Sequence, residues 1–63
     1  MPSDIPFKRI RKRLEHAGWR LDRIRGSHHV FTHPGCTPIV IPVHGGKVKA
    51  GYERQIKKRL GEE

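Results

Sequence analysis

The sequence predicts an α+β fold in the order α-β-β-β-α, with two helices packed on one face of a three-stranded antiparallel sheet. Two observations support this prediction. The spacing of the apolar residues changes from helical to alternating and back to helical along the chain, and tight-turn residues separate the middle segments. The chain has 63 residues, 33% of them apolar, which is enough for one thin layer of helix on sheet. We therefore expect a single domain over residues 1–63.

The first predicted helix covers residues 5–17. Its apolar residues share one helical face, at offsets of 0, 3, 7 and 10: Phe7, Ile10, Leu14 and Ala17. Ser3 or Asp4 is placed to cap the start, and Pro6 is tolerated in a first turn. Gly18 is placed to end the helix with a positive φ.

Three short strands are predicted next, over residues 19–25, 27–33 and 37–43. The turns between them are Gly26-Ser27 and Pro34-Gly35-Cys36. The third strand contains Pro38 and Pro42, and two prolines in one strand predict a position at the sheet edge.

A second helix is predicted from residues four apart, which share one face: Tyr52, Ile56 and Leu60. Both helices should cover the one apolar face of the sheet. This order is the arrangement of double-stranded-RNA-binding domains, which read the shape of the RNA helix and its phosphates. The analogy concerns the fold, and a fold alone does not define a function.

Charge is the strongest compositional signal. Fourteen Lys and Arg residues against six Asp and Glu residues give a net charge of +8. Such a chain is attracted to polyanions, so nucleic acid is the leading partner class, with an acidic protein or an anionic membrane surface as alternatives. The longest apolar run, residues 39–41, is far shorter than a membrane span. Cys36 is the only cysteine, which excludes an internal disulfide.

Four of the five histidines lie between residues 28 and 44. Histidine exchanges a proton near neutral pH, and RNA carries its own nucleophile, the 2′-hydroxyl group. A histidine that follows a turn, such as His28, could therefore cleave RNA with only cations to hold the phosphate. His29 and His33 are ~13 Å apart along a strand, too far to share one ion. No metal and no cofactor are expected.

The sequence resembles the HicA family of mRNA-interferase toxins. The resemblance covers about residues 5–61, and its motifs follow in order: Gly18-Trp19, Gly26-Ser27-His28-His29, Ile41-Pro42-Val43-His44, Lys47 and Gly51. The two histidine-containing tetrapeptides at this spacing are its most specific part. Three departures lie outside them: Pro38, Ala50-Gly51 where Pro-Gly is more usual, and the short acidic end Gly61-Glu62-Glu63.

The resemblance implies a domain like those that bind double-stranded RNA, with metal-independent cleavage of mRNA in the cytoplasm. It also implies a HicB-type antitoxin that covers the active site. The family's catalytic histidine is the one directly after Gly-Ser, here His28, and the glycine of that turn matches Gly26. We expect the 2′-hydroxyl group to attack the adjacent phosphate while His28 transfers protons.

Further RNA contacts are expected around this turn. Ser27 could orient His28 or bind a phosphate oxygen, and Arg23 and Arg25 flank the turn. Lys47 and Lys49 are predicted in a loop before the last helix, where the resembling RNA-binding fold places phosphate-binding lysines. His44 is expected near His28 across the meander and is a candidate second catalytic or phosphate-binding group.

The remaining candidates have plainer interpretations. If His28 points outwards, His29 points towards the helices as a hydrogen-bonded core residue, and no function is assigned to His33. His16 is expected to interact with the helix C-terminus, and Trp19 is expected in the core. The cluster over residues 8–13 is either a solvated helix face or a surface for the acidic antitoxin.

Two other classes of function stay open on the sequence alone. A non-catalytic double-stranded-RNA-binding module would use the same fold and charge, but it would not need a titratable group at the turn. A protein-interaction subunit would use its basic surface for an acidic partner. In each case we expect the free chain to be a monomer or a small oligomer.

Overall fold

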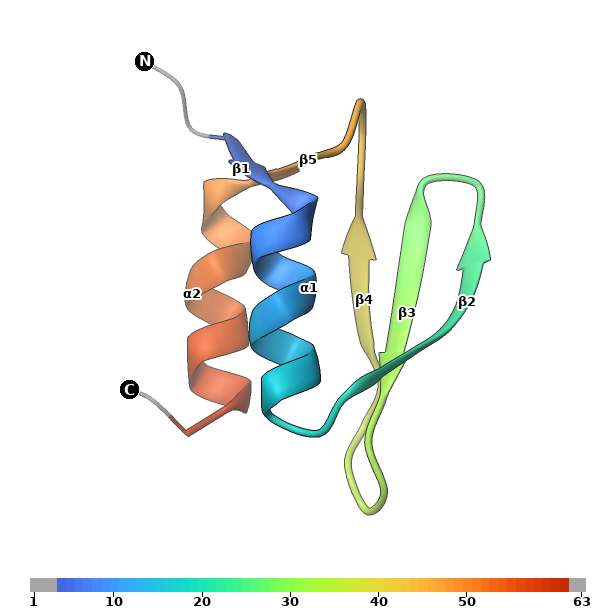
Figure 1. Ribbon diagram of the computed structural model, residues 1–63, viewed down its shortest axis with the longest axis vertical. Coiled ribbons are helices and arrows are strands. Elements are labelled where there is room, and N and C mark those ends of the chain that lie inside the picture. The colour runs from blue at the N-terminus through green and yellow to red at the C-terminus, as the bar shows by residue number, and fades with distance from the viewer. Residues whose placement is uncertain (1–3, 62–63) are drawn as a thin grey trace.

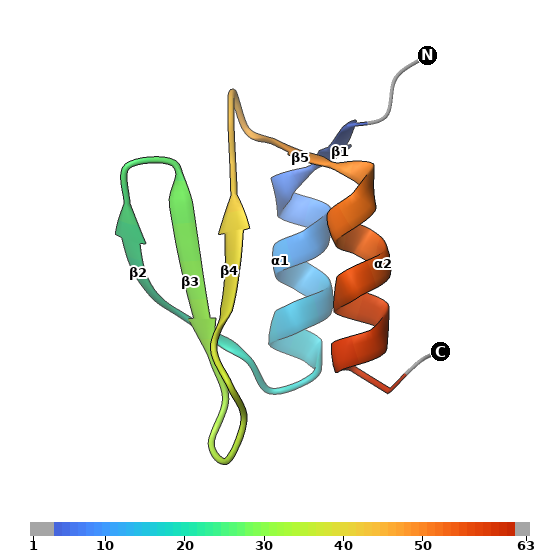
Figure 2. The ribbon, with the colours of Figure 1, turned by 180° about the vertical axis from the view of Figure 1, so that it is seen from behind.

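The computed structural model describes residues 4–61 as two helices lying side by side, next to a sheet of three strands (Figures 1 and 2). The elements in chain order are β1 (Asp4–Pro6), α1 (Phe7–His16), β2 (Arg20–Arg25), β3 (His28–Thr32), β4 (Ile39–Pro42), β5 (Lys47–Lys49) and α2 (Ala50–Arg59). The α+β class is confirmed, and so are the three antiparallel strands and two helices of the predicted order.

The three-stranded sheet has the order β2-β3-β4, so β4 lies at an edge, as the two prolines of the predicted third strand indicate. Pro42 is in β4, and Pro38 precedes it. Each strand is shorter than expected, because the residues beside the turns do not continue the ladder. The pairing of β2 with β3 is in register from Arg25 opposite His28 to Arg23 opposite Val30, and it shifts at a bulge between Leu21 and Arg23.

A second, two-stranded sheet was not predicted. In it, β1 pairs antiparallel with β5, with Ile5 opposite Val48. Residues 5–6 were expected in the first helix, and Lys47 and Lys49 were expected in a loop; both predictions are wrong. Each of these three-residue strands has only one inward side chain, Ile5 in β1 and Val48 in β5. The strands were not predicted because a single apolar residue cannot form an alternating pattern.

Helix α1 begins at Phe7, with Pro6 at its N-cap (φ −57°, ψ 131°) and no side-chain cap. The predicted cap at Asp4 is wrong because Asp4 belongs to β1, while Ser3 lies outside the described residues. Gly18 has φ +91° and ends the helix as predicted. Ala17 is exposed, because the helix has already ended at His16.

The core lies between the helices and one face of the three-stranded sheet. It combines residues from every layer: Ile5, Ile10, Leu14, Trp19, Phe31, Ile39, Ile41, Val48 and Ile56. This confirms that both helices cover the same sheet face and that Trp19 is a core residue. The other face of the sheet is not covered by any element of residues 4–61, and it carries the predicted site. In this part of the chain, no helix is long and apolar enough to cross a membrane.

Candidate active site

The neighbouring residues His28 and His29 point to opposite faces of the sheet. The ring of His29 lies 4.6 Å from that of Phe7 between centroids, and its Nδ1 is 3.3 Å from the carbonyl oxygen of Ser27. Because a carbonyl only accepts, Nδ1 of His29 carries the proton in this contact. His29 is therefore the inward, hydrogen-bonded histidine that was expected, whereas His28 is exposed on the open face.

Two rows of residues cross the open face. Residues opposite one another in an antiparallel sheet share a face, so the register defines both rows. One row runs Arg25, His28, Pro42, and the neighbouring row runs Arg23, Val30, Val40. The predicted arginines of β2 are thus on the same face as His28, and both are exposed.

The turn before His28 has the geometry that Gly-Ser favours. Gly26 has φ +57°, and Ser27 has no positive φ, as in a type II′ turn. A Cβ atom added to Gly26 would meet nothing within 4 Å, so the turn is open to close approach. The carbonyl oxygen of Ser27 accepts the N–H of Val43 at 2.7 Å, which ties the turn to the end of β4.

A shallow hollow of about 250 Å³ lies at the same end of the molecule, and we call it the cationic hollow. It is lined by Asp4, Pro42, His44, Lys47, Lys49 and Tyr52. Three predicted site residues therefore meet there: His44, Lys47 and Lys49. Pro42 links the hollow to the row that contains His28, because it lies directly opposite His28.

Backbone pairing holds these cations in place. His44 and Lys47 exchange two backbone hydrogen bonds of 3.0 Å across the Gly45-Gly46 turn. In β5, Lys47 and Lys49 are exposed on either side of the buried Val48, as strand alternation requires. His44 follows two residues after Pro42, so β4 carries it to the same end of the sheet as His28 (Figure 1).

Two lining residues of the hollow were not predicted as site residues. Tyr52 was assigned to the core face of the second helix, and the structure does pack it against the core cluster while it also lines the hollow. Asp4 was expected only as a helix cap. Neither residue has a distinctive sequence signal, because only the pairing of β1 with β5 brings Asp4 to this site.

The other histidines lie elsewhere. His33 contacts the carbonyl oxygen of Pro34 through Nδ1 at 3.0 Å, and its ring centroid lies 5.3 Å from that of Trp19. His16 is the last residue of α1, as its predicted interaction with the helix end requires. On α1, Arg9 and Arg13 contact Glu53 of α2 at 3.6 and 3.7 Å, so part of this basic face is neutralised within the chain.

Fold and site define a small, strongly basic α+β protein with an exposed histidine among cations on an open sheet face. The sequence matches the family described as HicA toxin of bacterial toxin-antitoxin over residues 7–62, and the chain belongs to this family. The predicted resemblance is confirmed. Comparisons with curated proteins and with solved structures gave no significant match.

Proposed function

We propose that this protein is an endoribonuclease that cleaves mRNA as the toxin of a toxin–antitoxin system. His28 is the proton-transfer group, and the surrounding cations hold the RNA backbone. The observation that carries the proposal is the position of His28: it is exposed on the open face, in one row with Arg25 and with Pro42 at the edge of the cationic hollow.

The proposed reaction uses the nucleophile that RNA itself provides. His28 accepts the proton of a 2′-hydroxyl group, and the O2′ atom forms a bond to the adjacent phosphorus. The bond from phosphorus to O5′ breaks, O5′ takes up a proton from water, and His28 returns its proton to the solvent. The products are a 2′,3′-cyclic phosphate and a 5′-hydroxyl end. Such proton transfer contributes roughly 10²–10⁴ to the rate.

The cations have a separate task. Negative charge builds up on the phosphate oxygens as the new bond forms, and fixed positive groups stabilise it. Arg23 and Arg25 flank His28 on the open face. His44, Lys47 and Lys49 in the cationic hollow bind the neighbouring backbone phosphates. Gly26 allows the RNA backbone to approach the turn, and Ser27 orients His28 or binds a phosphate oxygen.

The family also suggests an antitoxin partner. We propose an antitoxin of the HicB type that binds over His28 and excludes RNA. A net charge of +8 favours an acidic surface on that partner. On this proposal the chain acts in the cytoplasm, where its substrate is.

The ends of the RNA fragments test the proposed chemistry. We expect the wild-type protein to cut a long single-stranded RNA in excess EDTA and to leave 2′,3′-cyclic phosphate and 5′-hydroxyl ends. Fragments with 3′-hydroxyl ends would contradict attack by the 2′-hydroxyl group. Salt-dependent RNA binding without any cleavage would instead indicate a non-catalytic RNA-binding module.

A further inference from the structure

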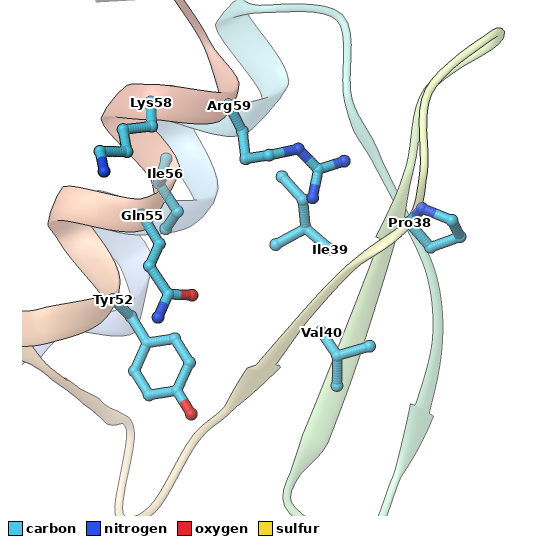
Figure 3. A pocket seen from close by; sticks show the side chains of 8 residues that line it. All are labelled: Pro38, Ile39, Val40, Tyr52, Gln55, Ile56, Lys58 and Arg59. Atoms are coloured by element: carbon cyan, nitrogen blue, oxygen red, sulfur yellow. The ribbon is translucent and has the colours of Figure 1, made fainter. Parts of the chain in front are cut away.

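A second hollow, of about 270 Å³, forms a groove between the edge strand β4 and helix α2 (Figure 3). It is distinct from the cationic hollow and takes no part in the proposed reaction. Its lining residues are Pro38, Ile39, Val40, Tyr52, Gln55, Ile56, Lys58 and Arg59. In Figure 3, Ile39 reaches towards Ile56 across the groove, and Arg59 extends from α2 over the end near Pro38.

One wall of the groove is the unpaired edge of β4. The N–H of Val43, just after β4, donates to the carbonyl oxygen of Ser27, just before β3, so hydrogen bonding alternates from there along the strand. Ile41 and Ile39 therefore direct their backbone groups towards β3, and Pro42 and Val40 direct theirs outwards. The outer edge of β4 thus offers carbonyl groups at both positions but an N–H only at Val40, because proline has none.

The chemistry of the lining indicates what this groove accepts. Its floor is apolar, and its rim on α2 carries the exposed Lys58. Arg59 adds a second positive charge there, although its guanidinium already donates to the carbonyl oxygen of Thr37 and lies 5.4 Å from the Trp19 ring centroid. None of its lining residues is acidic. A second copy of this chain would bring another charge of +8 to a basic rim, so self-association is disfavoured. An extended segment with apolar and acidic residues complements both the floor and the rim.

We propose that this groove binds an extended, acidic segment of a partner protein as an additional strand along β4. Backbone N–H groups of the segment meet the outward carbonyl groups, and one of its carbonyl groups accepts the N–H of Val40. Alternate apolar side chains enter the groove towards Ile39 and Ile56, and carboxylates meet Lys58 and Arg59. A strand added in this way would pair with an edge of β4 that no strand of residues 4–61 covers.

The groove is connected to the candidate active site through one residue. Tyr52 lines both the groove and the cationic hollow. A segment bound along β4 would therefore continue past Tyr52 towards Lys49, beside the proposed phosphate site. Binding in the groove would place the partner where it obstructs RNA, although the proposal does not depend on RNA cleavage.

The test is a nuclear magnetic resonance titration of the full ¹⁵N-labelled chain with an acetylated octapeptide of alternating valine and glutamate. We expect the amide signals of Val40 and of α2 around Gln55 to shift. The same peptide with lysine in place of glutamate should leave them unchanged. Lys58→Glu should weaken binding about tenfold. Lys12→Glu, which makes the same charge change on exposed α1, should not.

A second variant tests the strand addition itself. Val40→Pro removes the one outward donor without removing a ladder hydrogen bond, so we expect a folded chain that no longer binds the peptide. Folding is checked by the dispersion of the amide spectrum.

The proposal is overturned if the peptide causes no shift, or if the shifts fall on α1, or if Lys58→Glu and Lys12→Glu behave alike. It is also overturned if single-stranded RNA or self-association, but not the peptide, shifts Val40. None of these peptide-binding outcomes involves RNA cleavage. The result for the groove can therefore be told apart from a failure of the nuclease proposal.

Discussion

At the scale of single residues, the turn at Gly26 determines which histidine is exposed at the candidate site. Its φ of +57° is accessible to glycine and unfavourable for residues with a side chain. The turn fixes the register of β2 and β3, and the register decides that His28 faces outwards while His29 faces Phe7. A slip of one residue would exchange the two histidines.

Substituting this glycine tests its conformational role. Gly26→Ala should lower the free energy of unfolding by about 1–2 kcal/mol, because alanine is strained at this φ although its Cβ has room. Gly51→Ala is the matched control: Gly51 lies inside α2 with no positive φ, so alanine should raise stability by roughly 0.5–1 kcal/mol. Urea denaturation measures both. A Gly26→Ala variant as stable as the wild type would contradict the account.

The faces of the two histidines were predictable because strand alternation after a recognisable turn is a local rule. The cationic hollow was predictable only in part. Three of its residues stood out as charged or titratable residues near the end of the third strand. The sequence placed Tyr52 on a helix face towards the core, and it could not show that the same side chain also borders the site.

At the scale of elements, the long segments were predictable and the short ones were not. The spacing of Ile10 and Leu14 predicts α1, and the prolines within and just before β4 predict its edge position. In contrast, β1 and β5 have three residues each and are stabilised by pairing with one another across more than forty residues of sequence. No local pattern predicts such a pairing, because loop closure and packing decide it.

The two helices are also joined by charge. Glu53 of α2 lies between Arg9 and Arg13 of α1 at 3.6 and 3.7 Å, and its side chain is 23% exposed. These contacts join α2 to α1 in addition to the apolar core between them.

Removing the charge of Glu53 tests this contact. Glu53→Gln should lower the free energy of unfolding by about 1 kcal/mol, because two arginines lose a partly buried carboxylate. Glu15→Gln removes an exposed pair with Arg11 on one helix and should change stability by less than about 0.5 kcal/mol. Thermal or urea denaturation distinguishes the two. Equal changes in the free energy of unfolding would show that the contact between the helices stabilises the protein no more than the exposed pair does.

At the scale of the whole molecule, the two faces of the three-stranded sheet differ in what they carry. One face carries the core and is covered by both helices. The open face carries His28 with arginines from β2, and the cationic hollow lies at the end where the β2–β3 turn, β5 and the start of α2 gather (Figures 1 and 2). The structural layer therefore stabilises the chain while the open face stays available for a polyanion.

His28 is proposed to transfer protons in RNA cleavage, and a comparison of three forms of the protein tests this role. The wild type, His28→Ala and His16→Ala are incubated with a long single-stranded RNA in excess EDTA, at equal concentrations of folded protein. His16 is the matched control, because it is an exposed histidine at the end of α1.

The account predicts that the wild type and His16→Ala cleave alike. His28→Ala should cleave roughly 10²–10⁴-fold more slowly while it binds RNA with similar affinity. If His28→Ala cleaved as fast as the wild type, His28 would not be the proton-transfer group and the proposed mechanism would be wrong.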